Sequence, residues 1–429
     1  MKPLSVLWQW QSMGPYHFAR MRALSRIEGI ELTVVETSPV DQHGWIRSRS
    51  SDSLPVVTLT SESLSPGARQ RARHKLAKEL RERQPDVVVA SGYAEPWSFG
   101  VIQAYRSVHP ASLAVLWSES TVVDRARIRA KELLKKLFVA CFDGALVAGQ
   151  PHAAYLRRLG MRESDIQILG NCVDNEFYAA KADEIRRQTC ADNPCFLPND
   201  FVLFVGRMVP VKNLAALIDA YGIYRRETPG KACELVLVGS GFQESSLKQR
   251  AAQSGISGIR FDGLRQPDEL PAYYGRARCL ILPSVSEPWG LVVNEAMASG
   301  LPVLVSRQSG CAAELVQDGA NGFTFDALDQ QSIVSALHKI SSDTIDLRAL
   351  GARSRTIIDN YTPKLFGERA ADHLRYLYER QSRRATNLAQ MSRFLLRRTG
   401  PAVSTWLHFS EKPALRAEVY GPAYPNNRR

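Results

Sequence analysis

The 429-residue sequence contains no run of about 18 uninterrupted apolar residues, the length that a membrane-spanning helix requires. Its first residues lead directly into a strand-like segment and lack the pattern of a secretory signal peptide. Hydrophobic residues make up 45% of the chain and charged residues 23%, which excludes a disordered or fibrous protein. These features predict a folded cytoplasmic protein without a transmembrane anchor.

Cysteine is scarce and scattered. The chain has seven cysteines and no Cys-x-x-Cys pair, so neither a zinc site nor dithiol chemistry is expected. Cys233, Cys279 and Cys311 lie in apolar segments, where we expect them to be small buried hydrophobic residues. The sequence also lacks an Asp-x-Asp triplet, which would suggest a metal ion bridging a diphosphate. No metal or other cofactor is therefore predicted.

Positive charge is unevenly distributed along the chain. The formal net charge is +12, and residues 381–429 contribute more than half of it, with nine basic and two acidic side chains. Two further basic segments are Arg71–Arg83 and Arg125–Lys136. They leave two interpretations open, a solvated helix face or peripheral attachment to the anionic inner face of a membrane. No aromatic-interleaved basic strand or recognition helix indicates binding to nucleic acid.

Two successive runs of alternating strand-like and helical segments predict two α/β domains, as the chain length also suggests. In the first run we expect strands at Leu4–Trp10, Glu31–Glu36, Asp86–Ala90, Leu113–Trp117, Gly144–Ala148 and Ile166–Leu169. Helices expected between them include Pro66–Arg83, Pro96–Val108, Asp124–Phe142 and Pro151–Leu159. After a polar stretch, the second run predicts strands at Phe201–Val205, Glu234–Val238, Ile259–Asp262, Leu280–Pro283, Pro302–Ser306 and Gly322–Phe325.

The predicted domains are Rossmann-like and cover residues 1–180 and 181–362. A helix at 363–380, whose segment Lys364–Tyr378 is long enough to pack back across the N-terminal domain, is followed by a basic tail at 381–429. Ligands of open α/β sheets bind at the carboxyl ends of the strands. We therefore expect a site in a cleft between two sheets that face each other.

The strongest chemical signal is the segment from Glu287 to Pro302, EPWGLVVNEAMASGLP, which joins a strand end to a helix. Gly290, Leu291 and Val292 would present backbone N–H groups at the helix N-terminus, where the helix dipole favours a bound diphosphate. Glu295, inside the helix, can accept a hydrogen bond from each of two ribose hydroxyls. The alternative is that Glu287 is a capping acid and Glu295 a solvated helix residue.

The second signal is FVGRMVPVKN, residues 204–213, again at a strand end before a helix. Arg207 offers a planar fork for phosphate and Lys212 a movable point charge. Together they can offset the two negative charges of a leaving nucleoside diphosphate. The alternative is a pair of surface bases flanking a turn.

Both segments resemble motifs of the family-4 retaining glycosyltransferases, which have the GT-B fold with a C-terminal helix that crosses back to the N-terminal domain. The resemblance implies that Gly206, Arg207 and Lys212 flank the donor phosphates, that Glu287 contacts the donor sugar and that Glu295 binds the ribose. Catalysis would stabilise negative charge on the departing diphosphate through Arg207, Lys212 and helix amides, without a metal. Retention of anomeric configuration is likewise implied by the resemblance alone.

The resemblance also assigns weaker donor contacts. Glycine-rich strand ends let backbone approach a ligand closely. The corresponding stretches of this chain are Gly239 and Gly241, the segment Phe261, Asp262 and Gly263 near the base, and Gly14 in the loop after the first strand.

One departure from the family pattern matters for the mechanism. Many members carry a histidine after the fourth N-domain strand, where this chain reads Ser118-Glu119-Ser120. Glu119 is our candidate for an acceptor-side or sugar-contacting residue, and helix capping by this segment is the alternative. Neither His109 nor His152 occupies the matching place.

The sequence therefore predicts a glycosyltransferase that moves a sugar from a UDP- or GDP-sugar to a glycan or lipid-linked acceptor, in polysaccharide or glycoconjugate biosynthesis. Two rivals keep the same fold. One is a nucleotide- or polyanion-binding module without turnover, against which the set of Glu287, Glu295, Arg207 and Lys212 speaks. The other is a GT-B epimerase or phosphorylase.

Overall fold

The computed structural model describes residues 2–39, 54–92, 96–122, 129–188, 197–198 and 200–383. The predicted basic tail from residue 384 onward and the predicted start of a helix at Asp124 lie outside these residues. The chain divides into two compact units. Unit 1 runs to Asn171 and resumes at Pro363, and unit 2 runs from Cys172 to Thr362. The return at residue 363 coincides with the predicted one, whereas the predicted boundary at residue 180 falls inside unit 2.

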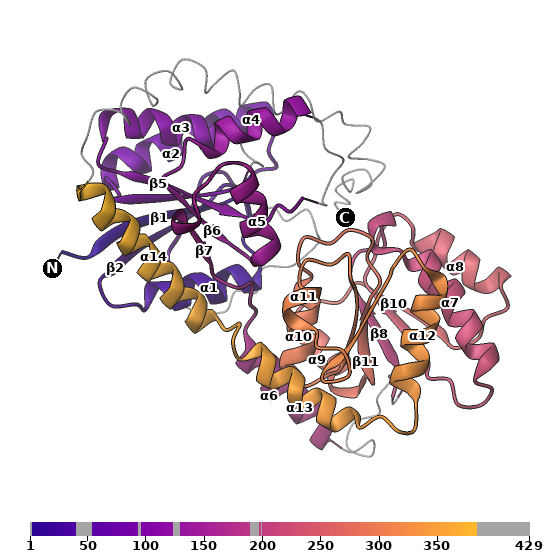
Figure 1. The fold of residues 1–429 in the computed structure, drawn as a ribbon. Coiled ribbons are helices and arrows are strands. Elements are labelled where there is room, and N and C mark those ends of the chain that lie inside the picture. The colour runs from indigo at the N-terminus through magenta and orange to yellow at the C-terminus, as the bar shows by residue number, and fades with distance from the viewer. Residues whose placement is uncertain are drawn as a thin grey trace. The chain divides into compact units, whose positions relative to one another are not determined.

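Unit 1 is built on a seven-stranded parallel sheet with the order β3-β2-β1-β4-β5-β6-β7 (Figure 1). Its strands are β1 (Leu4–Trp10), β2 (Ile30–Glu36), β3 (Val56–Thr58), β4 (Val87–Ser91), β5 (Leu113–Ser118), β6 (Gly144–Val147) and β7 (Ile166–Ile168). Every residue of β5 and β6 is buried. Such nearly continuous apolar strands are typical of a parallel sheet that is covered on both faces.

Helices cover both faces of this sheet. They are α1 (Pro15–Ser25), α2 (Pro66–Arg83), α3 (Pro96–Val108), α4 (Arg129–Val139), α5 (Gln150–Arg158) and α14 (Pro363–Arg383). Apolar residues of α2, α3, α4 and α5 share one core cluster with the sheet. On the other face α14 packs along α1, and Phe366 of α14 contacts Trp8 of β1 (Figure 1). The return of the C-terminal helix to the N-terminal domain is thus confirmed.

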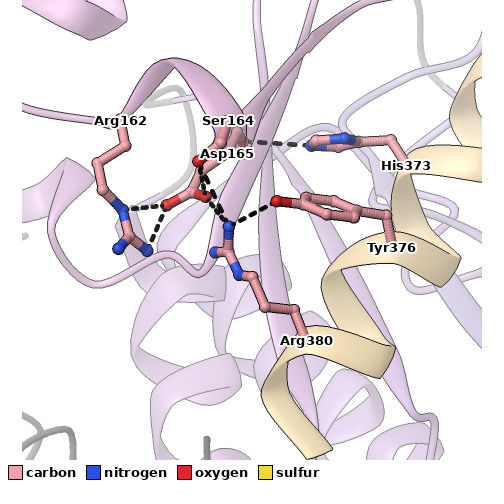
Figure 2. Close-up of polar contacts among 6 residues, drawn as sticks. All are labelled: Arg162, Ser164, Asp165, His373, Tyr376 and Arg380. Carbon is pink, nitrogen blue, oxygen red and sulfur yellow. Dashed lines mark hydrogen bonds and ion pairs between the residues drawn. The ribbon is translucent and has the colours of Figure 1, made fainter. Parts of the chain in front are cut away.

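An ionic cluster anchors the end of α14 to unit 1 (Figure 2). Asp165, whose side chain is 8% exposed, accepts hydrogen bonds from Arg380 of α14 and from Nε of Arg162, the latter at 2.8 Å. Nε2 of His373 lies 3.3 Å from the Asp165 carbonyl oxygen. A Cβ at Gly144 would lie only 2.5 Å from Cδ1 of Leu377, so this glycine allows α14 to approach β6 closely.

Unit 2 contains a six-stranded parallel sheet with the order β10-β9-β8-β11-β12-β13. Its strands are β8 (Val202–Val205), β9 (Leu235–Val238), β10 (Ile259–Gly263), β11 (Cys279–Leu282), β12 (Val303–Ser306) and β13 (Gly322–Phe325). Its helices are α6 (Asn175–Arg187), α7 (Leu214–Glu227), α8 (Glu244–Gln253), α9 (Leu270–Arg276), α10 (Leu291–Ala298), α11 (Ala312–Leu315), α12 (Gln330–Ser341) and α13 (Leu347–Ile358). Short 3₁₀ turns lie at Glu163–Asp165 in unit 1 and Pro210–Lys212 in unit 2.

The predicted strands are confirmed to within one residue at either end, and only β3 was not expected among the strands described. Helices α2 and α3 have the predicted bounds, whereas α4 ends at Val139, three residues before the predicted end. Cys233, Cys279 and Cys311 are buried, as expected. The sequence therefore predicted two Rossmann-like halves correctly.

Candidate functional site

The topology of unit 2 brings the two sequence motifs together. β8 and β11 are neighbours in the sheet, and the strand order reverses between them, so their carboxyl ends form the switch point where ligands of such sheets bind. Half-buried Gly206 and Arg207 follow β8 directly. The segment that leads to Glu287 follows β11, and the N–H of Val285 donates to the Val211 carbonyl oxygen at 2.9 Å. Both motifs therefore lie at one edge of one sheet.

Lys212 and Glu287 form an ion pair at this edge. Nζ of Lys212 donates to Oε2 of Glu287, and each side chain is only 14% exposed. The next residue, Asn213, adopts the left-handed conformation with φ of 56° and donates from its amide to the Ala327 carbonyl oxygen at 2.8 Å. The positive charge of Lys212, which the sequence predicted to offset the charge of a diphosphate, is thus neutralised by Glu287 in this structure.

The loop around Glu287 is fixed by a second chain segment. The N–H of Gly310 donates to the Glu287 carbonyl oxygen at 2.8 Å. A Cβ at Gly310 would lie 1.9 Å from the Pro288 carbonyl oxygen, so only glycine permits this approach. In addition, Nε1 of Trp289 donates to Oδ1 of Asn294 in α10 at 2.9 Å. These contacts hold Glu287 in a set position relative to α10.

Gly290 begins α10 in a conformation that other residues avoid. Its φ is +103°, and a Cβ would lie 2.7 Å from Cδ2 of Leu282 and 3.4 Å from Cγ of Glu287. The next two residues, Leu291 and Val292, are half-buried in the first turn of the helix. The first N–H groups of a helix have no acceptor within it, so this turn offers hydrogen-bond donors to an anionic ligand, and Lys212 beside it would add a cation if the ligand displaced Glu287.

Glu295 lies in α10 with its carboxyl group buried. The residue is 9% exposed, and its Oε2 accepts a hydrogen bond of 2.6 Å from the hydroxyl of Tyr274. Burial raises the pKa of Glu295 to about 7, while hydrogen bonds from Tyr274 and Tyr178 oppose the shift. The alternative interpretation of Glu295 as a solvated helix residue is therefore wrong. The two tyrosines were not predicted, because no local pattern links them to α10.

Gly239 and Gly241 serve the packing of one loop on another. The N–H of Gly206 donates to the Val238 carbonyl oxygen at 2.9 Å, which pairs the loops that follow β8 and β9. A Cβ at Gly239 would lie 1.9 Å from the Gly206 carbonyl oxygen, and one at Gly241 would lie 2.3 Å from that of Met208. The close approach that requires glycine is thus to neighbouring backbone. A contact of either glycine with the donor stays a prediction.

The segment at the end of β10 is also held by its neighbours. Asp262, with a side chain 3% exposed, accepts hydrogen bonds from Arg260 and from the Tyr273 hydroxyl, the latter at 2.9 Å. Half-buried Phe261 has Nζ of Lys248 5.7 Å from its ring centroid. Gly263, with φ of +71°, accepts the N–H of Gly239 at 2.7 Å. The predicted donor contacts of this segment stay predictions.

In unit 1, Gly14 caps α1 at the carboxyl end of β1. Its N–H donates to Nδ1 of His17 at 2.9 Å, and the His17 ring lies 4.4 Å from the ring of Trp10. Burial and the charge of Arg20 hold the pKa of His17 well below its usual range, so the ring is neutral at pH 7. His17 was not among the site residues predicted from the sequence. The pattern that could have indicated its contact with Gly14 is a histidine three residues after a glycine that caps a helix.

Glu119 lies at the carboxyl end of β5. It is exposed, and its Oε1 accepts a hydrogen bond of 2.7 Å from Nδ2 of Asn171, which follows β7 and is 1% exposed. The N–H of Ser120 donates to Oγ of Ser118 at 3.4 Å. Glu119 therefore lies at the edge of the sheet where ligands bind, and its predicted contact with an acceptor stays a prediction.

Within the described part of the chain, every helix is too short or too polar to cross a membrane. The same residues include no group of three or more His, Cys, Asp or Glu side chains placed to hold a metal ion.

Residues 191–357, less than half of the chain, match the family described as Glycosyl transferases group 1. Most of the chain shares its fold with Anabaena Alr3699/HepE, solved in complex with UDP and glucose. The TM-score is 0.66 and the identity 18%, over 87% of this chain and 100% of that one. The GT-B fold predicted from the sequence is confirmed.

Two relatives by sequence have named activities. The chain is 36% identical over 159 residues to a D-inositol 3-phosphate glycosyltransferase of Nocardia farcinica, covering 36% of this chain and 35% of the relative. It is 32% identical over 182 residues to a GDP-mannose-dependent alpha-(1-6)-phosphatidylinositol monomannoside mannosyltransferase of Mycolicibacterium smegmatis, covering 40% and 47%. Each alignment thus spans less than half of the relative.

Proposed function

We propose that this protein is a retaining glycosyltransferase that moves a sugar from a UDP- or GDP-sugar to a glycan or lipid-linked acceptor. One observation carries the proposal: the Lys212–Glu287 pair lies at the β8/β11 switch point beside the N-terminus of α10, where the group 1 domain and both motifs coincide. The names of the two relatives and the UDP-bound neighbour support a nucleotide-sugar donor.

The chemistry that these residues offer is electrostatic. As the bond between sugar and diphosphate lengthens, negative charge grows on the departing diphosphate. Lys212, Arg207 and the first N–H groups of α10 would stabilise that charge, while Glu287 would contact the donor sugar and Glu295 the ribose. Since these groups supply the positive charge, we propose that transfer needs no metal ion.

A transfer assay tests the proposal. The protein is incubated with UDP- or GDP-sugars and a mixture of glycan acceptors, and release of the nucleoside diphosphate is followed with and without a chelator. We expect acceptor-dependent release that the chelator leaves unchanged, and an α-linked donor should give an α-linked product by NMR. Binding without turnover would favour a non-catalytic module, and activity restored only by magnesium or manganese would refute metal independence.

A binding screen narrows the donor. A ligand at a hundred times its dissociation constant adds about 2.7 kcal/mol of stability, which raises the unfolding temperature of a domain of this size by roughly 5–10 °C. We expect this shift with either UDP or GDP. If neither nucleotide shifts the transition, the proposed donor class is wrong.

Peripheral attachment to a membrane is proposed on the exposed surface of unit 1. The residues of α2 that are exposed and basic are Arg71, Arg73, Lys75, Lys78, Arg81 and Arg83. On α4, Leu133 and Leu137 are 60% and 41% exposed and lie one turn apart. Exposed basic side chains and exposed leucines within one unit are the residue types that suit an anionic lipid surface. Failure to sediment with anionic vesicles at low salt would refute the attachment.

A further inference from the structure

Three helices of unit 2 meet at the carboxyl group of Glu295. Tyr274 comes from α9 and is 0% exposed, and its hydroxyl donates to Oε2 of Glu295 at 2.6 Å. Tyr178 comes from α6 and is 5% exposed, and its hydroxyl lies close enough to Glu295 to lower the pKa of that carboxyl group by hydrogen bonding. The rings of the two tyrosines pack edge to face, with centroids 5.9 Å apart. The carboxyl group is thus held from two sides.

Among the described residues, no cation lies close enough to the Glu295 carboxyl group to stabilise its ionised form. From α6 come Tyr178 and, next to it, Asp174 at the N-terminus. From α13, Arg355 reaches the opposite end of α10, where it donates to the Ser299 carbonyl oxygen at 3.4 Å and pairs with Asp183. A buried carboxylate in such a place is costly. The phenol hydroxyls are the groups that favour ionisation here.

We propose that Tyr178 and Tyr274 are positioning residues of the donor site, whose hydroxyls hold the Glu295 carboxylate so that it accepts the two ribose hydroxyls of a nucleoside diphosphate. This inference rests on the proposed function. It names the residues that set recognition of the ribose, which neither motif of the sequence contains.

The number of hydrogen bonds that the Glu295 carboxylate can accept is enough for both the tyrosines and the ribose. An ionised carboxylate has about four acceptor positions and no donor. Two phenol hydroxyls occupy two of them, which leaves two for the vicinal hydroxyls of a ribose. Because the tyrosines favour the ionised form against burial, they also set the pH above which the carboxylate can accept both ribose hydroxyls.

α6 is itself firmly held. It is the first helix of unit 2, and Nδ2 of Asn175 donates to the carbonyl oxygens of Ile358 at 3.1 Å and Tyr361 at 3.3 Å, shortly before the chain returns to unit 1. Tyr178 lies one turn further along this helix. Its hydroxyl therefore occupies a fixed position, as a positioning residue requires.

The experiment compares two probes on three variants. Tyr274→Phe and Tyr178→Phe each remove one hydroxyl, and Tyr224→Phe is the matched control. Tyr224 is 0% exposed in the same unit, and its hydroxyl donates to Oγ of Ser341 at 2.7 Å, away from Glu295. The probes are UDP or GDP, whichever the unmodified protein binds, and its 2′,3′-dideoxy analogue. Affinity for each probe is measured by calorimetry between pH 5.5 and 8.5.

We expect Tyr274→Phe and Tyr178→Phe to bind the ribose nucleotide roughly tenfold to a hundredfold more weakly, the range for a hydrogen bond to a charged group. Affinity for the dideoxy analogue should stay the same, because that analogue makes no contact with Glu295. The pH midpoint for binding the ribose nucleotide should rise in both variants, and Tyr224→Phe should change neither quantity.

Each other outcome has a distinct meaning. Equal losses for both probes, or the same loss in Tyr224→Phe, would show that the hydroxyls act only through stability and would overturn the inference. An unmodified protein that does not distinguish the ribose nucleotide from the dideoxy analogue would overturn it too. If the unmodified protein binds neither UDP nor GDP, the proposed function fails instead. Should one variant not fold, the other and Glu295→Gln carry the same comparison.

Discussion

The Lys212–Glu287 ion pair leads to a prediction about nucleotide affinity. In this structure Glu287 is paired with Lys212, the cation that a diphosphate would bind, and both side chains are 14% exposed. A bound diphosphate must therefore compete with Glu287 for Nζ of Lys212. Glu287→Gln removes the competing charge and keeps the shape. We expect this variant to bind the nucleoside diphosphate more tightly than the unmodified protein does.

The magnitude follows from the burial of the pair. Exposed ion pairs contribute about 0–1 kcal/mol, and removing one partner of a buried pair costs about 3–5 kcal/mol. At 14% exposure the pair lies between these limits, so we expect Glu287→Gln to lower the free energy of unfolding by about 1–3 kcal/mol. The same energy released to the ligand strengthens nucleotide binding roughly fivefold to a hundredfold.

Calorimetric titration with UDP or GDP measures the change in affinity, and thermal unfolding with and without the nucleotide measures the change in stability. Asp343→Asn is the control, because Asp343 pairs with Lys231 on the surface of the same unit, with side chains 87% and 77% exposed. That variant should change neither quantity. Sugar transfer by Glu287→Gln should fall, since the proposed contact with the donor sugar is lost. Unchanged or weaker nucleotide binding would refute the reasoning.

Three further predictions concern other charges of the structure. Arg207→Ala should lower turnover by roughly two or more orders of magnitude, and a normal rate in the transfer assay would remove Arg207 from the mechanism. Asp165→Asn should lower the free energy of unfolding by about 3 kcal/mol in denaturant titration, because it leaves Arg380 without its buried partner; a loss below 1 kcal/mol would contradict this. The pKa of Glu295 is raised from 4.5 to about 7, so the folded state binds its proton more tightly than the unfolded state does and stability should fall by about 3 kcal/mol as pH rises across that interval. Glu295→Gln should lack this fall, and an unchanged pH profile would exclude Glu295 as its source.

The fold was predictable because its signals are local. Strands buried on both faces read as continuous apolar runs, such as VVVA in β4 and CLIL in β11, and proline and glycine mark the helix boundaries. The exception, β3, has three half-buried residues at the edge of its sheet, too few to show a period. Its pairing with β2 is decided by tertiary contact.

The candidate site was predictable only in part, because its contacts join distant positions. The motifs located Lys212 and Glu287 at strand ends, but 75 residues separate them, and no spacing in the sequence pairs one with the other. Tyr274 lies 21 residues before Glu295 in a different helix. The sequence could therefore name the carboxyl groups but not the residues that hold them, and for the same reason it left open the alternative of a solvated Glu295, which the structure excludes.

The glycine-rich strand ends were also only partly informative, because the sequence does not say which group approaches the glycine. A glycine-rich strand end predicts a close approach of backbone, and such an approach exists at Gly239, where a Cβ would lie 1.9 Å from the Gly206 carbonyl oxygen. The approaching group belongs to the loop that follows β8, so the glycine fixes the position of Gly206 and Arg207 whether or not it touches a ligand. Gly239→Ala should then weaken nucleotide binding by displacing that loop, and it should slow transfer together with binding. Tight binding in a well-folded Gly239→Ala variant would show that the loop tolerates displacement, and the close packing of the two loops would lose its role in the site.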